Sequence, residues 1–142
     1  MPFPAVGLNK KWQPHRKNNM SKESMGLEYR TSDRAIIIDG RSGFFDINHS
    51  QMEAFLTSLV LNIIDEIDGI IVDCEQYPRI ASHGIGNLVA IHREMKRYKK
   101  QLALIGVKGF IHEVLNNTGL LEHFKLFDSE SDARAFLTES AS

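Results

Sequence analysis

The sequence predicts an α/β protein in which a mixed β-sheet of about four to five strands is covered by about four helices. Short apolar segments rich in β-branched residues recur along the chain, and segments with apolar residues every three or four positions separate them. Strands that alternate with helices build parallel sheets through right-handed crossovers. The 142 residues suit one domain of ordinary size.

Five segments are expected to form the strands. The stretch "LEYRTSDRAIIIDG", residues 27–40, contains a short strand, a Ser-Asp turn and a strand centred on Ile37, which predicts an N-terminal hairpin. An antiparallel hairpin joined to parallel strands makes the sheet mixed. "GIIVDCE" and "LALIGV" are typical of buried strands, and "FKLF" predicts a short edge strand.

The first predicted helix begins after Asn48. Asn48 and Gln51 have the spacing of a capping box, in which each side chain bonds the other residue's backbone N–H. The residues that follow place one apolar face on this helix, at Met52, Phe55, Leu56, Leu59, Val60 and Ile63. We expect this face to cover the sheet.

Three further helices follow. The stretch "IASHGIGNLVAIH" starts one whose inner face holds His92, expected as a hydrogen-bonded core residue, and whose end carries the basic run Lys96 to Lys100. Cations there are favoured by the negative end of the helix dipole. "GFIHEVLNNTGL" predicts a helix capped by Gly119. "SESDARAFL" predicts a last helix capped by Ser129 or Ser131.

Charge is unevenly divided between the two parts of the chain. Residues 1–26 hold five basic residues against one acidic residue, a net charge of +4, which leaves −5 of the total −1 for residues 27–142. We expect residues 1–26 to be a flexible basic N-terminal tail, with contact to RNA or a membrane as the alternative. The acidic remainder argues against a nucleic-acid-binding surface.

Composition also bears on location and on the single cysteine. No apolar run approaches the ~20 residues that span a bilayer, so direct membrane insertion is not expected. The N-terminus lacks the apolar core of a signal peptide, and a cytoplasmic location is expected. Cys74 closes a buried strand without a base or second cysteine nearby in sequence, and we interpret it as a structural thiol.

The stretch around Ser82 was tested against three kinds of site. It has Gly84 and Gly86 but Val89 at the third glycine position of a dinucleotide fingerprint, and no Gly-Lys-Ser/Thr of a P-loop follows. Ile80 occupies the first glycine position of a G-x-S-x-G elbow. The six histidines never form the His-x-x-x-His spacing of a zinc site. We therefore expect no catalytic residue, no metal and no cofactor.

Ser82 lies between a buried strand and an apolar helical pattern, where an N-cap residue is expected. Capping the free N–H groups of the first turn explains a serine at this position. The same N–H groups and the helix dipole also stabilise a phosphate. Ser82 is therefore either a cap alone or a cap that accepts phosphate, and phosphorylation would then disrupt a partner surface over this helix end.

The order of these motifs resembles the STAS family, named for sulfate transporters and anti-sigma factor antagonists. The similarity runs from Leu27 to Leu137, with a Gly-x-x-Asp turn at Gly43 and Asp46, the stretch "ASHGIG" where the family has Asp-Ser-Ser-Gly-Leu-Gly, and the ending "VLNNTGLLEHFKLFDSESDARAFL". The resemblance implies a STAS domain over residues 27–142. Two residues depart from the pattern, because Ala81 replaces an acidic residue and His83 replaces a second hydroxyl residue.

The resemblance implies a non-enzymatic, bacterial partner-switching regulator. Ser82 falls on the serine that antagonist members phosphorylate, and the implied partner-binding positions are Asp46, Ala81, His83, Gly84, Ile85 and Gly86. The implied partners are a serine-protein kinase of the anti-sigma type and a PP2C-type phosphatase, with transcription or biofilm formation as the regulated output. Two alternatives stay open: a soluble STAS subunit of a membrane transport system, and a STAS domain that binds a small ligand or nucleotide.

Overall fold

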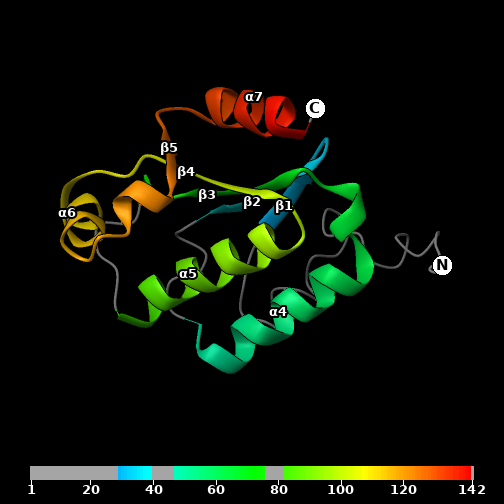
Figure 1. Ribbon diagram of the computed structural model, residues 1–142, viewed down its shortest axis with the longest axis horizontal. Helices are drawn as coiled ribbons and strands as arrows, with labels where there is room; N and C mark the ends of the chain where they lie inside the picture. Colours follow the sequence, from blue (N-terminus) through cyan, green and yellow to red (C-terminus); the bar gives the residue numbers. More distant parts are fainter. Residues whose placement is uncertain (1–28, 40–46, 76–81, 142) are drawn as a thin grey trace.

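The computed structural model describes residues 29–39, 47–75 and 82–141, which form a sheet with helices on both faces (Figure 1). The strands lie in the order β1-β2-β3-β4-β5. Their bounds are β1 Tyr29–Ser32, β2 Ala35–Asp39, β3 Gly69–Asp73, β4 Gln101–Ile105 and β5 Lys125–Phe127. β1 pairs antiparallel with β2, and the other neighbours pair in parallel. The mixed sheet, its N-terminal hairpin and its short last strand confirm the predicted fold class.

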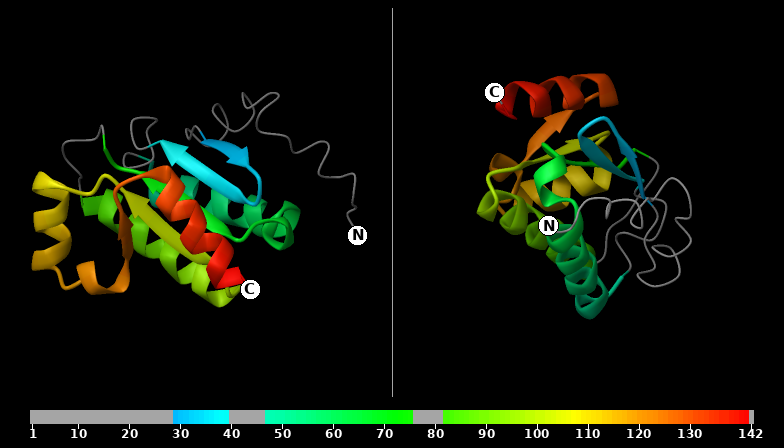
Figure 2. Two further views of the ribbon diagram at one scale, coloured as in Figure 1. Left: turned by 90° about the horizontal axis from the view of Figure 1, so that it is seen from above. Right: turned by 90° about the vertical axis from the view of Figure 1, so that its right-hand side faces the viewer.

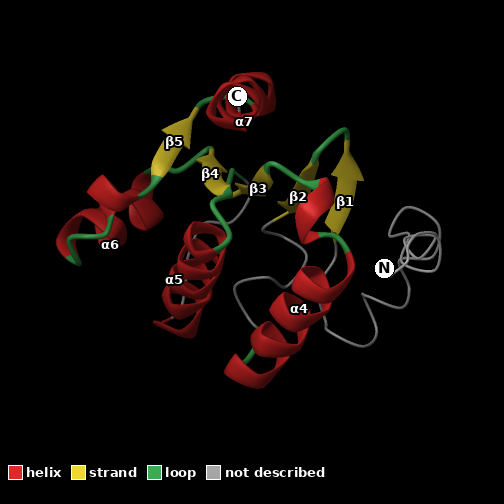
Figure 3. Cartoon of the chain, turned by 45° about the vertical axis from the view of Figure 1, so that its right-hand side comes forward, coloured by secondary structure: helices red, strands yellow, loops and turns green. Residues whose placement is uncertain are grey.

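Within the described residues, four α-helices and two short 3₁₀ helices accompany the strands. Their bounds are α4 His49–Asn62, η2 Ile64–Glu66, α5 Ser82–Arg97, α6 Gly109–Asn117, η3 Leu121–His123 and α7 Glu130–Ala141. From β2 to β5 each crossover advances one place in the same direction, so right-handed crossovers put their helices on one face. Figures 2 and 3 show α4 and α5 on one face of the sheet and α7 on the other.

The two faces of the sheet bury two separate apolar clusters. Alternate strand residues point to opposite faces. Ile36, Ile70 and Leu102 belong to the larger cluster, which α4, α5 and α6 cover. Their neighbours Ile37 and Ile71 belong to the smaller cluster, which α7 covers with Ala133 and Leu137. Because both faces are covered, β2, β3 and β4 read as continuous apolar runs in the sequence.

The predicted caps of α4 and α7 are present. The Asn48 Oδ1 accepts a hydrogen bond of 2.8 Å from the Gln51 backbone N–H, and the Gln51 Oε1 accepts one of 2.8 Å from the Asn48 N–H. The Ser129 Oγ accepts a bond of 3.1 Å from the Asp132 N–H, so Ser129 caps α7. Each cap satisfies N–H groups that a helix start leaves without an internal partner.

Two helices end in the same kind of turn but with different residues. After α6, Gly119 has φ +76°, and the N–H groups of Gly119 and Leu120 bond the carbonyls of Asn116 and Leu115. After α5, Lys99 has φ +61°, and the N–H groups of Lys99 and Lys100 bond the carbonyls of Lys96 and Met95. This is a Schellman motif in both cases. A side chain in the left-handed region costs about 1–2 kcal/mol relative to the right-handed one, so the lysine turn is strained and the glycine turn is not.

Gly69, the first residue of β3, allows a close approach between strands. A Cβ atom added there would collide with the backbone oxygen of Gln101 and would lie 2.8 Å from the Leu137 Cδ2. Gly69 and Gln101 are register partners at the beginning of β3 and β4. The absence of a side chain at Gly69 therefore lets α7 and β4 close over this end of the sheet.

Ion pairs hold α7 against the hairpin. Arg30 Nη2 lies 2.7 Å from Glu130 Oε1, and Arg134 Nη2 lies 3.0 Å from Glu130 Oε2. Burial raises the pKa of Glu130, but the hydrogen bonds from Arg30 and Arg134 outweigh it and hold that pKa below its usual value. Arg134 also reaches Asp33 in the hairpin turn, at 3.4 Å.

Candidate functional site

The candidate site lies at one edge of the sheet, which we call the carboxyl edge because three parallel strands end there. Asp39, Asp73 and Ile105 are the last residues of β2, β3 and β4, and they are neighbours in register. The chain segments that follow these strands therefore leave the sheet together. Edges of this kind are where open α/β sheets place their binding sites.

The structure places only some of the residues predicted for the site. Asp46 and Ala81 lie outside the described residues. Ser82 and His83 are the first two residues of α5. An N-cap at Ser82 would have put the first helical residue at His83, so the helix begins one residue earlier than expected. This difference is within the range over which helix ends are assigned.

The three residues that follow differ in exposure. Gly84 is buried, Ile85 is half-buried against the larger cluster, and Gly86 is exposed. A Cβ atom added to Gly86 would meet nothing within 4 Å. Ser82 and Gly86 are one helical turn apart, so they lie on the same side of α5. A glycine inside a helix costs about 0.8–1 kcal/mol relative to alanine. No contact among the described residues requires the glycine at this position.

Asn87 connects α5 to the start of α4. Its side chain is 4% exposed, and its Nδ2 donates a hydrogen bond of 3.1 Å to the backbone oxygen of Ile47. Ile47 directly follows Asp46 in the chain. The bond thus holds the segment after β2 beside the second turn of α5. Asn87 is not among the residues predicted for the site, although the sequence has a signal for it, a polar residue beside the apolar Leu88.

The turn after β4 completes the edge. Gly106 has φ +71°, and a Cβ atom there would lie 2.6 Å from the Glu75 Cβ, so this turn contacts the one after β3 directly. Lys108 Nζ lies 3.6 Å from Glu75 Oε2. Phe110, in the first turn of α6, is 47% exposed. Phe110 is not among the residues predicted for the site, because it lies beside the apolar face of α6 and resembles a core residue in the sequence.

The electrostatics of the α5 start favour an anion. The first turn of α5 contains no acidic residue. Its N–H groups lack carbonyl partners within the helix, and the helix dipole is positive there. Covalently attached or bound phosphate is therefore stabilised at this end.

Cys74 is not a second reactive group at this edge. It is 2% exposed, and burial, followed by the charge of Asp73, raises its pKa to about 12. The thiol is therefore protonated at neutral pH, and a protonated thiol is a poor nucleophile. The interpretation of Cys74 as a structural thiol is confirmed.

His92 corrects an expectation. It was predicted as a hydrogen-bonded core residue, but it is only half-buried and stacks edge-to-face on Phe124, with 5.3 Å between ring centroids. The cause is the length of β5, whose first residue, Lys125, is paired with Ala103. Gln101 and Leu102 therefore have no β5 partner, and the helix beneath them is left uncovered at that end.

Two further kinds of site were sought in the described ranges. Among residues 29–39, 47–75 and 82–141, no group of three or more His, Cys, Asp or Glu side chains is arranged to hold a metal ion. Over the same ranges, every helix is too short or too polar to cross a bilayer.

Solved structures show the same fold in other proteins. A putative anti-sigma factor antagonist from Thermotoga maritima superposes with a TM-score of 0.61 at 18% identity, over 79% of this chain and 94% of that one. SpoIIAA from Bacillus, in its phosphorylated form, gives 0.56 at 16% identity, over 78% and 98%. A sulfate transporter family protein from Wolinella succinogenes gives 0.58 at 19% identity, over 78% and 90%. At these identities the likeness concerns the fold alone.

The sequence itself identifies the family. No curated protein matches this chain. The profile of the STAS domain matches residues 27–133, which is most of the chain. The match includes the strand and helix that form the candidate site, from β3 to the end of α5. This protein therefore belongs to the STAS domain family.

Proposed function

We propose that this protein is a non-enzymatic partner-switching regulator controlled by phosphorylation of Ser82. In the unphosphorylated state its carboxyl edge binds a serine kinase of the anti-sigma type. The kinase brings the ATP and transfers phosphate to Ser82, and the complex then separates. A PP2C-type phosphatase removes the phosphate and restores binding.

One observation carries the proposal: Gly86 is exposed, has open space around it, and lies one turn from Ser82. The glycine lowers the stability of the helix, and no contact within the described residues requires it. A bare stretch of helix lets another protein approach the backbone closely. We infer that the partner contacts α5 beside Ser82, with Ile85 at the border between that contact and the core.

The helix start explains how phosphate could switch binding without unfolding the domain. Phosphate adds a charge of about −1.5 to −2, which the free N–H groups of the first turn accommodate. In an interface, the same charge without cationic partners costs about 2–5 kcal/mol. This weakens binding by roughly 30-fold to several thousand-fold. Two of the solved neighbours support a phosphorylated state, since SpoIIAA has been solved in unphosphorylated and phosphorylated forms.

The test compares Ser82→Asp with Ser82→Ala for binding to the kinase captured by the wild-type chain, with mass spectrometry of the Ser82 peptide. We expect Ser82→Asp to weaken binding by at least roughly 30-fold, and Ser82→Ala to keep wild-type affinity. Ser131→Asp is the matched control, because Ser131 is exposed in the first turn of α7 on the opposite face of the sheet. Wild-type affinity in Ser82→Asp would disprove the switch.

A second candidate function rests on the likeness to the sulfate transporter family protein. In that case this domain is a separate subunit that binds a membrane transporter. Such a complex should co-purify with membrane proteins, and treatment with phosphatase should leave it unchanged. Dissociation on phosphorylation of Ser82 would favour the partner switch instead.

A further inference from the structure

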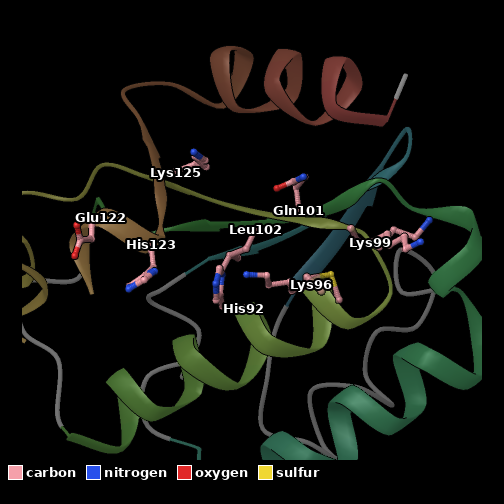
Figure 4. A pocket seen from close by; sticks show the side chains of 10 residues that line it. His92, Lys96, Lys99, Gln101, Leu102, Glu122, His123 and Lys125 are labelled. Carbon is pink, nitrogen blue, oxygen red and sulfur yellow. The ribbon is translucent and has the colours of Figure 1, made fainter. Parts of the chain in front are cut away.

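The end of α5 opposite to Ser82 borders a recess that the proposed function does not use. The recess has a volume of about 410 Å³ and lies between α5, the start of β4, and η3 with β5 (Figure 4). It opens where β5 leaves Gln101 and Leu102 without a strand partner. We call it the basic pocket and define it by six of its lining residues: His92, Lys96, Lys99, Lys100, His123 and Lys125.

The four lysines of the basic pocket differ from the other cations of the molecule. No ion pair joins any of them to an acid among the described residues. Of the six other described lysines and arginines, all except Arg93 are paired with a carboxylate. Glu122 is the acid that lines the recess. The pocket therefore holds four lysines and one acid, and none of these lysines forms an ion pair with a described carboxylate.

The strained turn at the end of α5 adds an independent observation. Lys99 has the left-handed backbone that Gly119 has after α6, and a glycine would relieve its strain. The last turn of the helix already has two cations that interact favourably with its dipole, Lys96 and Arg97. Strained residues gather at functional sites. The strain at Lys99 is explained if its ammonium group serves the pocket.

His92 is close to the positive charges of the basic pocket. In Figure 4 its ring lies beside the ammonium group of Lys96, and His123 approaches from η3. Burial, then the charge of Lys96, then that of His123 lower the pKa of His92. An anion among these groups would remove the repulsion that they exert on one another.

We propose that the basic pocket binds a small anion that carries two or more phosphate groups. Lysine binds phosphate as a compact point charge with three donors, and four lysines together suit a ligand with several negative charges. The cations come from α5, the turn after it, η3 and β5, and in Figure 4 the side chains of Lys99 and Lys125 extend away from His92 and Lys96. A ligand with several charged groups suits cations that line different sides of one recess. Met95 and Leu102, both buried, supply apolar contacts in the recess.

A small ligand fits better than a nucleic acid. The recess has the size of a small-molecule site, which is about 300–1,000 Å³. Nucleic-acid binding requires cations spread along a surface, whereas residues 27–142 carry a net charge of −5. The site is also separate from Ser82, because α5 is 16 residues long and spans about 24 Å.

Calorimetry with inorganic tripolyphosphate and with ATP tests the pocket. We expect Lys99→Gly to weaken binding about fivefold and to raise Tm by about 2–4 °C, because it removes a charge and relieves the turn. A stabilised variant that loses affinity cannot be explained by unfolding. The double change Lys96→Gln with Lys100→Gln should weaken binding by at least about 20-fold. Arg93→Gln is the control on the same helix, with an expected change below about twofold.

The outcomes separate the sources of the phosphate and the competing explanations. Equal affinity for tripolyphosphate and ATP identifies the phosphate chain as the recognised group. Tighter binding of ATP identifies a ligand whose organic part contacts Met95 and Leu102. Ser82→Asp should bind tripolyphosphate as the wild type does, so failure of the partner switch leaves this result intact. The proposal is overturned if tripolyphosphate does not bind, if Lys99→Gly keeps full affinity, or if a short RNA binds and Arg93→Gln weakens it equally.

Discussion

The two ends of α5 are both suited to phosphate, but by different means. At the start, around Ser82 and Gly86, the first turn has no acidic residue and one position has no side chain. At the end, Lys96, Lys99 and Lys100 gather in one turn with Lys125 opposite them. The backbone partial charge is positive at the start of a helix and negative at its end. The backbone alone can therefore hold a phosphate at the first end, whereas the second end needs lysines to overcome its own dipole.

This difference separates covalent from reversible recognition. A phosphate on Ser82 is held by its bond, so the helix start need only tolerate the charge. An anion in the basic pocket has no such bond, so side chains must supply the entire attraction.

Asn87→Ala should remove the contact between the start of α5 and Ile47. The loss leaves a carbonyl without its buried partner and should lower the free energy of unfolding by about 2 kcal/mol, measured by urea denaturation. Asn62→Ala is the comparison, because the Asn62 Nδ2 bonds Ser58 O within its own helix, at 2.7 Å. Equal losses in the two variants would mean that the bond to Ile47 has no special role. Tripolyphosphate binding should be unchanged.

Gly86→Leu should affect the partner and spare the fold. Leucine is a better helix former than glycine by about 0.8 kcal/mol, and the space around Gly86 is open, so Tm should not fall. Kinase binding should weaken by at least roughly tenfold, which is about 1.4 kcal/mol, because the side chain blocks a close approach. Arg93→Leu, two turns further along the same side of α5, is the control. A normal affinity in Gly86→Leu would place the interface elsewhere.

His92→Gln should change how stability depends on pH. Because the folded protein lowers the pKa of His92, the unfolded chain binds more protons near that pKa, and stability falls as pH decreases below about 6.5. Lys96 and His123 are the charged groups that act on His92, and Lys99, Lys100, Glu122 and Lys125 line the same pocket. The variant should flatten the profile of Tm between about pH 7.5 and 5.5. Tripolyphosphate should flatten it in the wild type also, because the anion stabilises protonated His92. An unchanged slope in the variant would exclude His92 as the titrating group.

The fold and the start of α5 could be predicted from the sequence because their signals are local. Strands buried on both faces appear as continuous apolar runs, and the capping box of Asn48 and Gln51 lies within four residues. The serine and glycines at the start of α5 likewise lie within five residues. Asp46 and Ala81, predicted for the same site, lie outside the described residues, so those two predictions remain predictions.

The basic pocket could not be predicted because its cations come from distant segments. The run from Lys96 to Lys100 was attributed to the helix dipole, and nothing in the sequence relates it to Lys125 or His123. The offset between β4 and β5 opens the recess, and it can be recognised only when the register of the two strands is known. The net acidic charge of residues 27–142 gives no sign of the basic pocket, because a total charge carries no information about local clustering.

The place of α7 has a consequence for synthesis. On the first face of the sheet, the helices α4, α5 and α6 are each synthesised before a strand that they help to cover. The second face is covered only by α7, which follows all five strands in the chain. While residues 130–141 are being synthesised, Ile37, Ile71 and Ile105 have no helix packed over them. Domains emerge from the amino end at about 5–20 residues per second, and exposed apolar strands promote aggregation. Completion of the last helix therefore determines when the second face of the sheet is protected from aggregation.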